Sequence, residues 1–140
     1  MSRRPSHSPI VFDTQALLKF YLGEKGAEEV ENQLKLVLEK EVKGYLNLVN
    51  LAEFYYILCR VDNNLGREKE SNLRSYGIEI VPLADDESEL WKRAAMVKAE
   101  HSLSLADAFA AATALCLNAR LITGADKEFD GIRNLRVERL

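Results

Sequence analysis

The feature that most constrains this sequence is the repeated alternation of short apolar runs with longer segments of helical period. Apolar runs of strand length occupy residues 10–12, 45–49, 78–81, 120–123 and 135–140. The segments between them repeat apolar residues every three or four positions, as helices with one buried face do; they cover residues 14–22, 27–42, 51–61, 67–76, 85–100 and 105–117. Strands separated by helices pair in parallel through right-handed crossovers. We therefore predict an α/β fold: a three-layer α/β/α sandwich with a mostly parallel central sheet of about four or five strands.

The length of 140 residues corresponds to one domain. No internal repeat or linker divides the chain. Residues 1–9 are rich in Ser, Arg and Pro and lack a periodic pattern, so we expect a disordered leader followed by a single domain at 10–140.

Composition excludes several classes of protein. No stretch approaches the roughly 20 apolar residues of a membrane span, and the leader lacks the apolar core of a signal peptide. We therefore expect a cytoplasmic protein without a membrane partner. The two cysteines form no C-x-x-C pair and the two histidines lie far apart, so a zinc site is not indicated. The net charge of −3 argues against binding nucleic acid through bulk charge.

Polar side chains follow the strands that should lie at the centre of the sheet. In open parallel sheets, ligands bind outside the carboxyl ends of the strands. The side chains at or near these ends are Asp13, Glu53, Asp107, Thr123 and Asp126. Four of the five are carboxylic acids, so the sequence predicts an acidic crevice.

Each acid also has a purely structural interpretation. Asp13 can cap the helix that follows it. Asn50-x-x-Glu53 has the form of a capping box, and Ser104-x-x-Asp107 has nearly the same form. Asp126 can be an ordinary loop residue. One capping group suffices for each helix, however, and these helix starts should all face the same crevice.

Clustered carboxylates favour a bound cation. Two charges 4 Å apart repel by about 4 kcal/mol at an effective dielectric constant of 20. Such a cluster must take up protons or hold a metal ion. Oxygen ligands without His or Cys select Mg²⁺ or Mn²⁺ rather than zinc. An ion held in this way commonly activates a water for attack on a phosphodiester.

At these residues the chain resembles the PIN-domain nucleases, most closely the VapC-type toxins of toxin–antitoxin systems. Residues 10–18 resemble the opening strand and first acid of that family, and residues 45–60 resemble its second motif. Residues 103–114 are similar to the third and most specific motif. Residues 121–129, with Thr123, Asp126 and Phe129, resemble the last.

The resemblance implies a Mg²⁺- or Mn²⁺-dependent endoribonuclease that cleaves RNA with a metal-activated water. It assigns the acidic quartet to Asp13, Glu53, Asp107 and Asp126, as catalytic and metal-binding residues, and the polar fifth member to Thr123. It further implies a homodimer and a small antitoxin whose tail enters the acidic groove. In the family the last acid often follows the threonine by two residues. Here Ala125 intervenes, so Asp130 competes with Asp126 for this role.

Three other functions share some of these features. A phosphorylated receiver-like module needs an acidic pair after its first strand, and Asp13 has no acidic neighbour. A haloacid-dehalogenase-type phosphatase needs a second acid where Gln15 stands. A PIN-like interaction module with little catalysis stays open as the alternative. The helices around residues 51–58 and 90–97 carry enough apolar residues to form a dimer face as well as core.

Overall fold

A computed structural model describes residues 8–124 and 127–140 of the chain. Its five strands form one sheet in the order β3-β2-β1-β4-β5, and every neighbouring pair is parallel. The strands are β1 (Ile10–Phe12), β2 (Gly44–Asn47), β3 (Glu79–Val81), β4 (Arg120–Thr123) and β5 (Arg136–Arg139). The predicted α/β class and parallel sheet are therefore confirmed.

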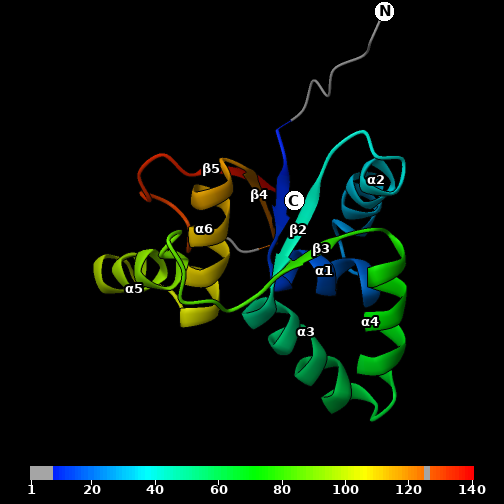
Figure 1. Ribbon diagram of the computed structural model, residues 1–140. Coiled ribbons are helices and arrows are strands. Elements are labelled where there is room, and N and C mark those ends of the chain that lie inside the picture. Colours follow the sequence, from blue (N-terminus) through cyan, green and yellow to red (C-terminus); the bar gives the residue numbers. More distant parts are fainter. Residues whose placement is uncertain (1–7, 125–126) are drawn as a thin grey trace, which may run out of the picture.

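Helices cover both faces of this sheet (Figure 1). One layer contains α1 (Thr14–Tyr21), α2 (Ala27–Leu38), α3 (Leu48–Val61) and α4 (Leu65–Ser75). The other contains α5 (Leu90–Glu100) and α6 (Leu105–Leu117). None of the described helices is long and apolar enough to cross a bilayer.

The alternation of side chains along β1 divides the hydrophobic core in two. Ile10 and Phe12 are fully buried among side chains of α1 to α4. Val11 lies on the opposite face of the sheet and packs against the small residues of α6, Ala108 among them. Successive strand residues point to opposite faces. A strand with no polar position is therefore what a sheet covered on both sides requires.

The start of α3 differs from the prediction. We expected Asn50 to cap a helix beginning at residue 51, whereas α3 begins at Leu48. The cap is Asn47, whose Oδ1 accepts a hydrogen bond from the Val49 N–H at 2.8 Å. Asn50 lies inside the helix and is fully buried. Glu53 therefore belongs to the second turn of α3 and is not part of a capping box.

The start of α5 also moves, from residue 85 to Leu90. The Asp86 carboxylate accepts hydrogen bonds from the N–H of Ser88 at 3.0 Å and from its hydroxyl at 2.5 Å. Glu89 then takes a left-handed conformation, with φ of 52°. These side-chain bonds compete with helical ones, so residues 85–89 form an acidic turn in front of the helix.

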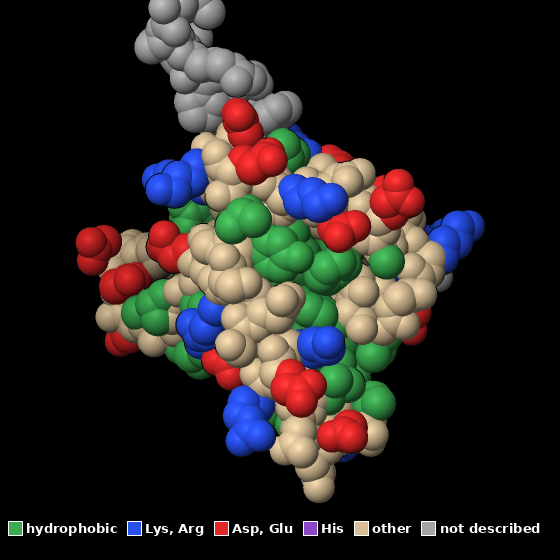
Figure 2. Space-filling view, turned by 90° about the vertical axis from the view of Figure 1, so that its right-hand side faces the viewer, with side chains coloured by type: hydrophobic (Ala, Val, Ile, Leu, Met, Phe, Trp, Pro, Cys, Tyr) green, Lys and Arg blue, Asp and Glu red, His purple; other side chains and the backbone are tan. Residues whose placement is uncertain are grey.

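One face of the molecule exposes hydrophobic side chains. Figure 2 views the side of α1, α2 and α4 and shows hydrophobic groups at its centre, with charged groups of both signs around them. On α1, the ring of Phe20 makes edge-to-face contacts with Tyr21 and Tyr76. Leu22, which follows α1, is 38% exposed.

Gly44 provides a test of the packing between β2 and α2. A Cβ atom on Gly44 would lie 2.6 Å from Cγ2 of the buried Val37. We expect Gly44→Ala to lower the free energy of unfolding by about 1–3 kcal/mol, because a β-branched buried side chain has little room to move. Urea unfolding measures this effect. Val37→Ala should relieve the clash, so the double variant should lose less free energy of unfolding than the sum of the losses in the two single variants. Additive losses would contradict this packing of β2 against α2.

Candidate functional site

The strand order places the topological switch point of the sheet between β1 and β4, and we refer to the region outside their carboxyl ends as the acidic crevice. These two strands are neighbours, and from β1 the chain continues to β2 and β3 on one side, whereas β4 and β5 lie on the other. Such a change of direction opens a crevice outside the carboxyl ends of the two strands, where open parallel sheets bind their ligands. Asp13 follows β1 directly, and Thr123 is the last residue of β4.

Asp13 is held by hydrogen bonds on both carboxylate oxygens. Its side chain is 1% exposed. Oδ1 accepts from the Ala16 N–H at 2.7 Å, which caps α1. Oδ2 accepts from the hydroxyl of the buried Thr123. The capping interpretation is therefore confirmed for Asp13, whose other carboxylate oxygen faces β4 and is not needed for the cap.

Asp107 lies in the first turn of α6, near Asp13. Ser104 caps this helix, with its hydroxyl oxygen accepting from the Asp107 N–H at 3.1 Å. Asp107 is half-buried, and its negative charge acts on the carboxylate of Asp13. The structure thus brings Asp13, Thr123 and Asp107 together, as the sequence predicted.

Burial makes both carboxyl groups hard to ionise. It raises the pKa of Asp13 to about 7; hydrogen bonds from Thr123 and Ala16 oppose this rise, and the charge of Asp107 adds to it. Burial also raises the pKa of Asp107, against the hydrogen bonds of Ser104, and the charge of Glu128 contributes to the rise. A cation at this position would relieve both effects.

Within the residues that the structure describes, Glu53 does not form a three-carboxylate cluster with Asp13 and Asp107. It is half-exposed in the second turn of α3. Its helix is tied to the site through Asn50, whose Nδ2 donates to the Ala106 carbonyl oxygen at 3.0 Å. The main-chain carbonyl oxygen of Asn50 accepts a hydrogen bond from the Thr14 hydroxyl at 3.1 Å. The first turns of α1, α3 and α6 are thereby joined.

Asp126 lies outside the described residues. Its competitor Asp130 forms an ion pair with Arg139 of β5. Glu128, which is not among the acids predicted for the site, acts electrostatically on Asp107. The sequence signal for Glu128 is its position two residues after Asp126 and directly before Phe129. Phe129 is 2% exposed and packs in the core of the α6 layer, which fixes the position of this segment.

A buried polar group beneath the site was also missed. Asn47 donates through Nδ2 to the Thr113 hydroxyl at 3.0 Å, and that hydroxyl donates to the Phe109 carbonyl oxygen at 2.7 Å. Both side chains are fully buried. The signal in the sequence was a polar residue inside an otherwise apolar stretch, as at Asn50 and Thr113.

The side chains at the crevice fit a hard divalent cation by their chemistry. They offer oxygen atoms alone, two of the carboxyl groups have raised pKa values, and like charges approach one another. Within residues 8–124 and 127–140, no three His, Cys, Asp or Glu side chains lie close enough to hold an ion by themselves. A complete ligand set therefore needs Asp126 or a movement of Glu53 or Glu128.

Comparison with known proteins identifies relatives of this fold. The family model described as PIN domain matches residues 10–135. No curated protein matches the sequence.

Solved structures match over nearly the whole chain. VapBC2 from Rickettsia felis, bound to a promoter DNA fragment, contains a chain with a TM-score of 0.74 and 20% identity, covering 93% of this chain and 97% of the other. For DNA-bound VapBC from Salmonella typhimurium the TM-score is 0.72 and the identity 14%, with 94% of this chain and 98% of the other covered. For a toxin–antitoxin complex from Klebsiella pneumoniae the TM-score is 0.69 and the identity 21%, with 90% of this chain and 94% of the other covered. Identities this low show a shared fold.

The raised pKa of Asp13 predicts a pH-dependent effect of Asp13→Asn in protein freed of metal by EDTA. The folded state binds the Asp13 proton up to about pH 7, whereas the unfolded chain releases it near 3.8. The ionised group therefore destabilises the fold increasingly as the pH rises through this interval. Asparagine also caps helices and carries no charge.

We expect Asp13→Asn to unfold at a higher temperature than the wild type at pH 8. Its free energy of unfolding should exceed that of the wild type by on the order of 1–4 kcal/mol at this pH, and the difference should shrink toward pH 4. Calorimetry over this pH range measures the difference. Asp130→Asn is the matched control, because its exposed carboxylate is paired with Arg139. A gain that is independent of pH would contradict the raised pKa.

Proposed function

Because the chain belongs to the PIN-domain family, whose members are generally nucleases, we propose that it is a Mg²⁺- or Mn²⁺-dependent endoribonuclease and the toxin of a type II toxin–antitoxin pair. The observation that carries this proposal is the convergence of the Asp13 and Asp107 carboxylates beside Thr123, at the carboxyl ends of β1 and β4. Its fold is VapC-like.

We propose that Asp13 and Asp107 hold the metal, together with Asp126 and Glu53. When bound, the ion would supply a water of lowered pKa and neutralise charge on the phosphodiester. Thr123 would orient the Asp13 carboxylate through the hydrogen bond it already donates. Asp13 caps α1 and Asp107 lies in the first turn of α6. The positive N-terminal ends of these helices favour the ionised carboxylates and an approaching phosphate.

Glu128 joins the proposed site as a further acid. Its charge already acts on Asp107, whereas the carboxylate of Asp130 is engaged by Arg139. We therefore propose that the segment after β4 supplies acids through Asp126 and Glu128, and that Asp130 supports the position of β5 instead.

The proposed partners are RNA as substrate and a small antitoxin. Support for the antitoxin comes from the solved structures of similar fold, which are toxin–antitoxin complexes. We propose that a basic antitoxin tail would enter the acidic crevice and that both proteins act in the cytoplasm, where the RNA is found.

We also propose a homodimer formed through α3. The apolar residues of α3 that face the core, Phe54 and Leu58 among them, are fully buried. Leu48, Tyr55 and Tyr56 stay 37–47% exposed on the outside of the same helix. Such a row of exposed apolar and aromatic side chains is typical of a subunit interface.

The proposal predicts that cleavage depends on the buried aspartates. We expect expression of the wild type in a bacterial host to stop growth and to create new RNA 5′ ends, as mapped by sequencing. Asp13→Asn and Asp107→Asn should reduce cleavage by the purified protein more than about 100-fold, and Thr123→Val by about 10–100-fold. EDTA should abolish cleavage, and Mn²⁺ should restore it. Cleavage that survives both EDTA and these substitutions would exclude the proposal.

Glu128 and Asp130, the acids on either side of Phe129, allow a test of which acid belongs to the proposed site. Glu128→Gln should lower cleavage and weaken Mn²⁺ binding in calorimetry by about 10-fold or more. Asp130→Asn should leave both nearly unchanged. The opposite order would assign the role to Asp130. A wild type that binds no Mn²⁺ and cleaves no RNA would favour the alternative function, a PIN-like interaction module.

A further inference from the structure

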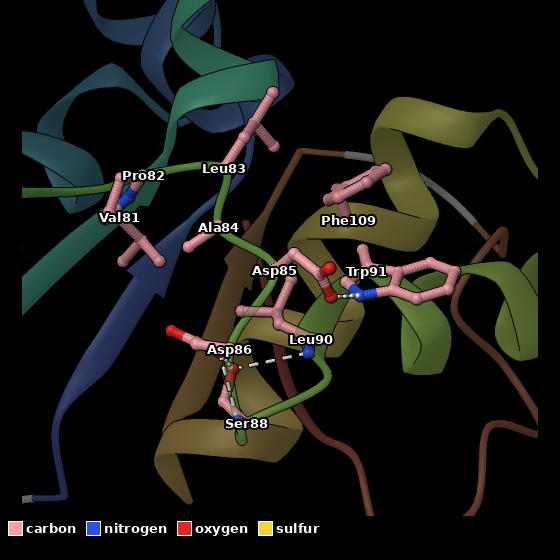
Figure 3. A pocket seen from close by; sticks show the side chains of 10 residues that line it. All are labelled: Val81, Pro82, Leu83, Ala84, Asp85, Asp86, Ser88, Leu90, Trp91 and Phe109. Atoms are coloured by element: carbon pink, nitrogen blue, oxygen red, sulfur yellow. Dashed lines mark hydrogen bonds between the residues drawn. The ribbon is translucent and has the colours of Figure 1, made fainter.

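An apolar pocket of about 540 Å³ lies beside the exit of β3. Its walls come from the extended segment after β3, the acidic turn at 85–89, the start of α5 and one side chain of α6. Figure 3 shows the lining residues around this hollow. The volume lies within the range of about 300–1,000 Å³ that is typical of binding pockets.

The pocket is separate from the acidic crevice. Its single contribution from α6 is Phe109, two residues after Asp107. Positions two apart on a helix differ by about 200° in direction. Asp107 and Phe109 therefore serve opposite sides of α6, and the proposed nuclease site does not explain the pocket.

Two large side chains of the lining are exposed. Leu83 is 56% exposed and Trp91 is 45% exposed. The indole N–H of Trp91 donates to Asp85 Oδ1 at 3.1 Å, so its polar atom is already satisfied (Figure 3). The ring itself remains available for an apolar partner. Tryptophan in such a setting often dominates binding energy at an interface.

The rim of the pocket is strongly acidic. The turn carries four acids within five residues: Asp85, Asp86, Glu87 and Glu89. Across the described parts of the chain, Glu89 alone among these four has a basic partner, Lys92 at 2.6 Å. Hydrogen bonds from Ser88 hold the pKa of Asp86 below its usual range, so that its charge persists. A ligand that fills the pocket should therefore carry positive charge beside its apolar group.

The backbone next to the pocket is also free to bind. β3 is the edge strand of the sheet and pairs with β2 on one side. In residues 8–124 and 127–140, no hydrogen bond uses the main-chain groups of Leu83 or Ala84. Extended segments at sheet edges bind extended peptides through such groups.

We propose that this pocket binds an extended segment of a partner protein that carries a large apolar side chain flanked by Lys or Arg. The apolar side chain fills the pocket beside Trp91. The basic side chain lies against Asp85 and Asp86. The acidic rim favours a basic segment over a second copy of this chain, whose own net charge is −3. Because residues 90–97 are also expected to contribute to a dimer face, a second copy is the competing occupant that the test must distinguish.

The test is selection from a phage-displayed library of random heptapeptides against the full-length protein in EDTA, which also removes nuclease activity from the readout. We expect the selected peptides to share a large apolar residue next to Lys or Arg. The best peptide, synthesised with a fluorescent label, should bind in an anisotropy assay. Trp91→Ala should weaken this binding at least about 10-fold, and the pair Asp85→Asn and Asp86→Asn should weaken it most at low salt.

Matched controls locate the binding. Met96→Ala alters a residue of α5 that is 52% exposed and does not line the pocket, so affinity should be unchanged. Asp107→Asn should also leave affinity unchanged, which separates this pocket from the acidic crevice. Should Trp91→Ala fail to fold by circular dichroism, Leu83→Ser replaces it, because Leu83 is more exposed.

Several results would overturn the proposal. They are a failure to select peptides, selected peptides without a basic residue, and binding that survives Trp91→Ala or is lost in Asp107→Asn. Analytical ultracentrifugation gives a further result that would overturn it. If Leu83→Asp converts a dimer into a monomer, a second copy occupies the pocket. Loss of nuclease activity does not enter any of these outcomes, so the two proposals stand or fall separately.

Discussion

The hydrogen bond from the Thr123 hydroxyl to the Asp13 carboxylate joins the ends of the two central strands, and the site depends on it. It holds one carboxylate oxygen toward β4 while the other caps α1. Because Asp13 is 1% exposed, its charge is stabilised mainly by these bonds and opposed by burial. A site that is unfavourable for a bare carboxylate is favourable for a carboxylate that shares a cation.

The other helices of the site are positioned by buried polar contacts. Asn50 joins α3 to the first turn of α6 and, through Thr14, to α1. Asn47 reaches Thr113 in the middle of α6. Buried hydrogen bonds of this kind are costly to break on one side only. They therefore fix the relative positions of three helix starts more narrowly than apolar packing among alanines would.

The two edges of α6 carry different chemistry. Asp107 points to the crevice, and Phe109 lines the apolar pocket beside β3. The pocket adds an acidic rim to an apolar floor, whereas the crevice concentrates carboxylates in a buried place. One helix thus supports a proposed site for phosphodiester chemistry and a proposed site for a basic peptide without the two overlapping.

Hydrophobic period and strand-end position were sufficient to predict the parallel α/β sandwich, and to bring Asp13, Asp107 and Thr123 to one edge of the sheet. These features are local: a buried strand must be apolar, and its carboxyl end must precede a helix or loop. The sequence did not predict that Asn47 rather than Asn50 caps α3, because either asparagine can accept from a nearby N–H. The choice depends on where β2 stops pairing.

Long-range contacts decided the rest. The raised pKa of Asp13 arises mainly from burial, and the charge of Asp107, a residue distant in sequence, adds to it. The approach of Glu128 to Asp107 and the ion pair of Asp130 with Arg139 depend on how the segment after β4 packs, which no local pattern contains. The sequence by itself therefore determined which acids follow the strands. Only the tertiary structure decided which of them meet, because distance and burial, rather than residue type, control their interaction.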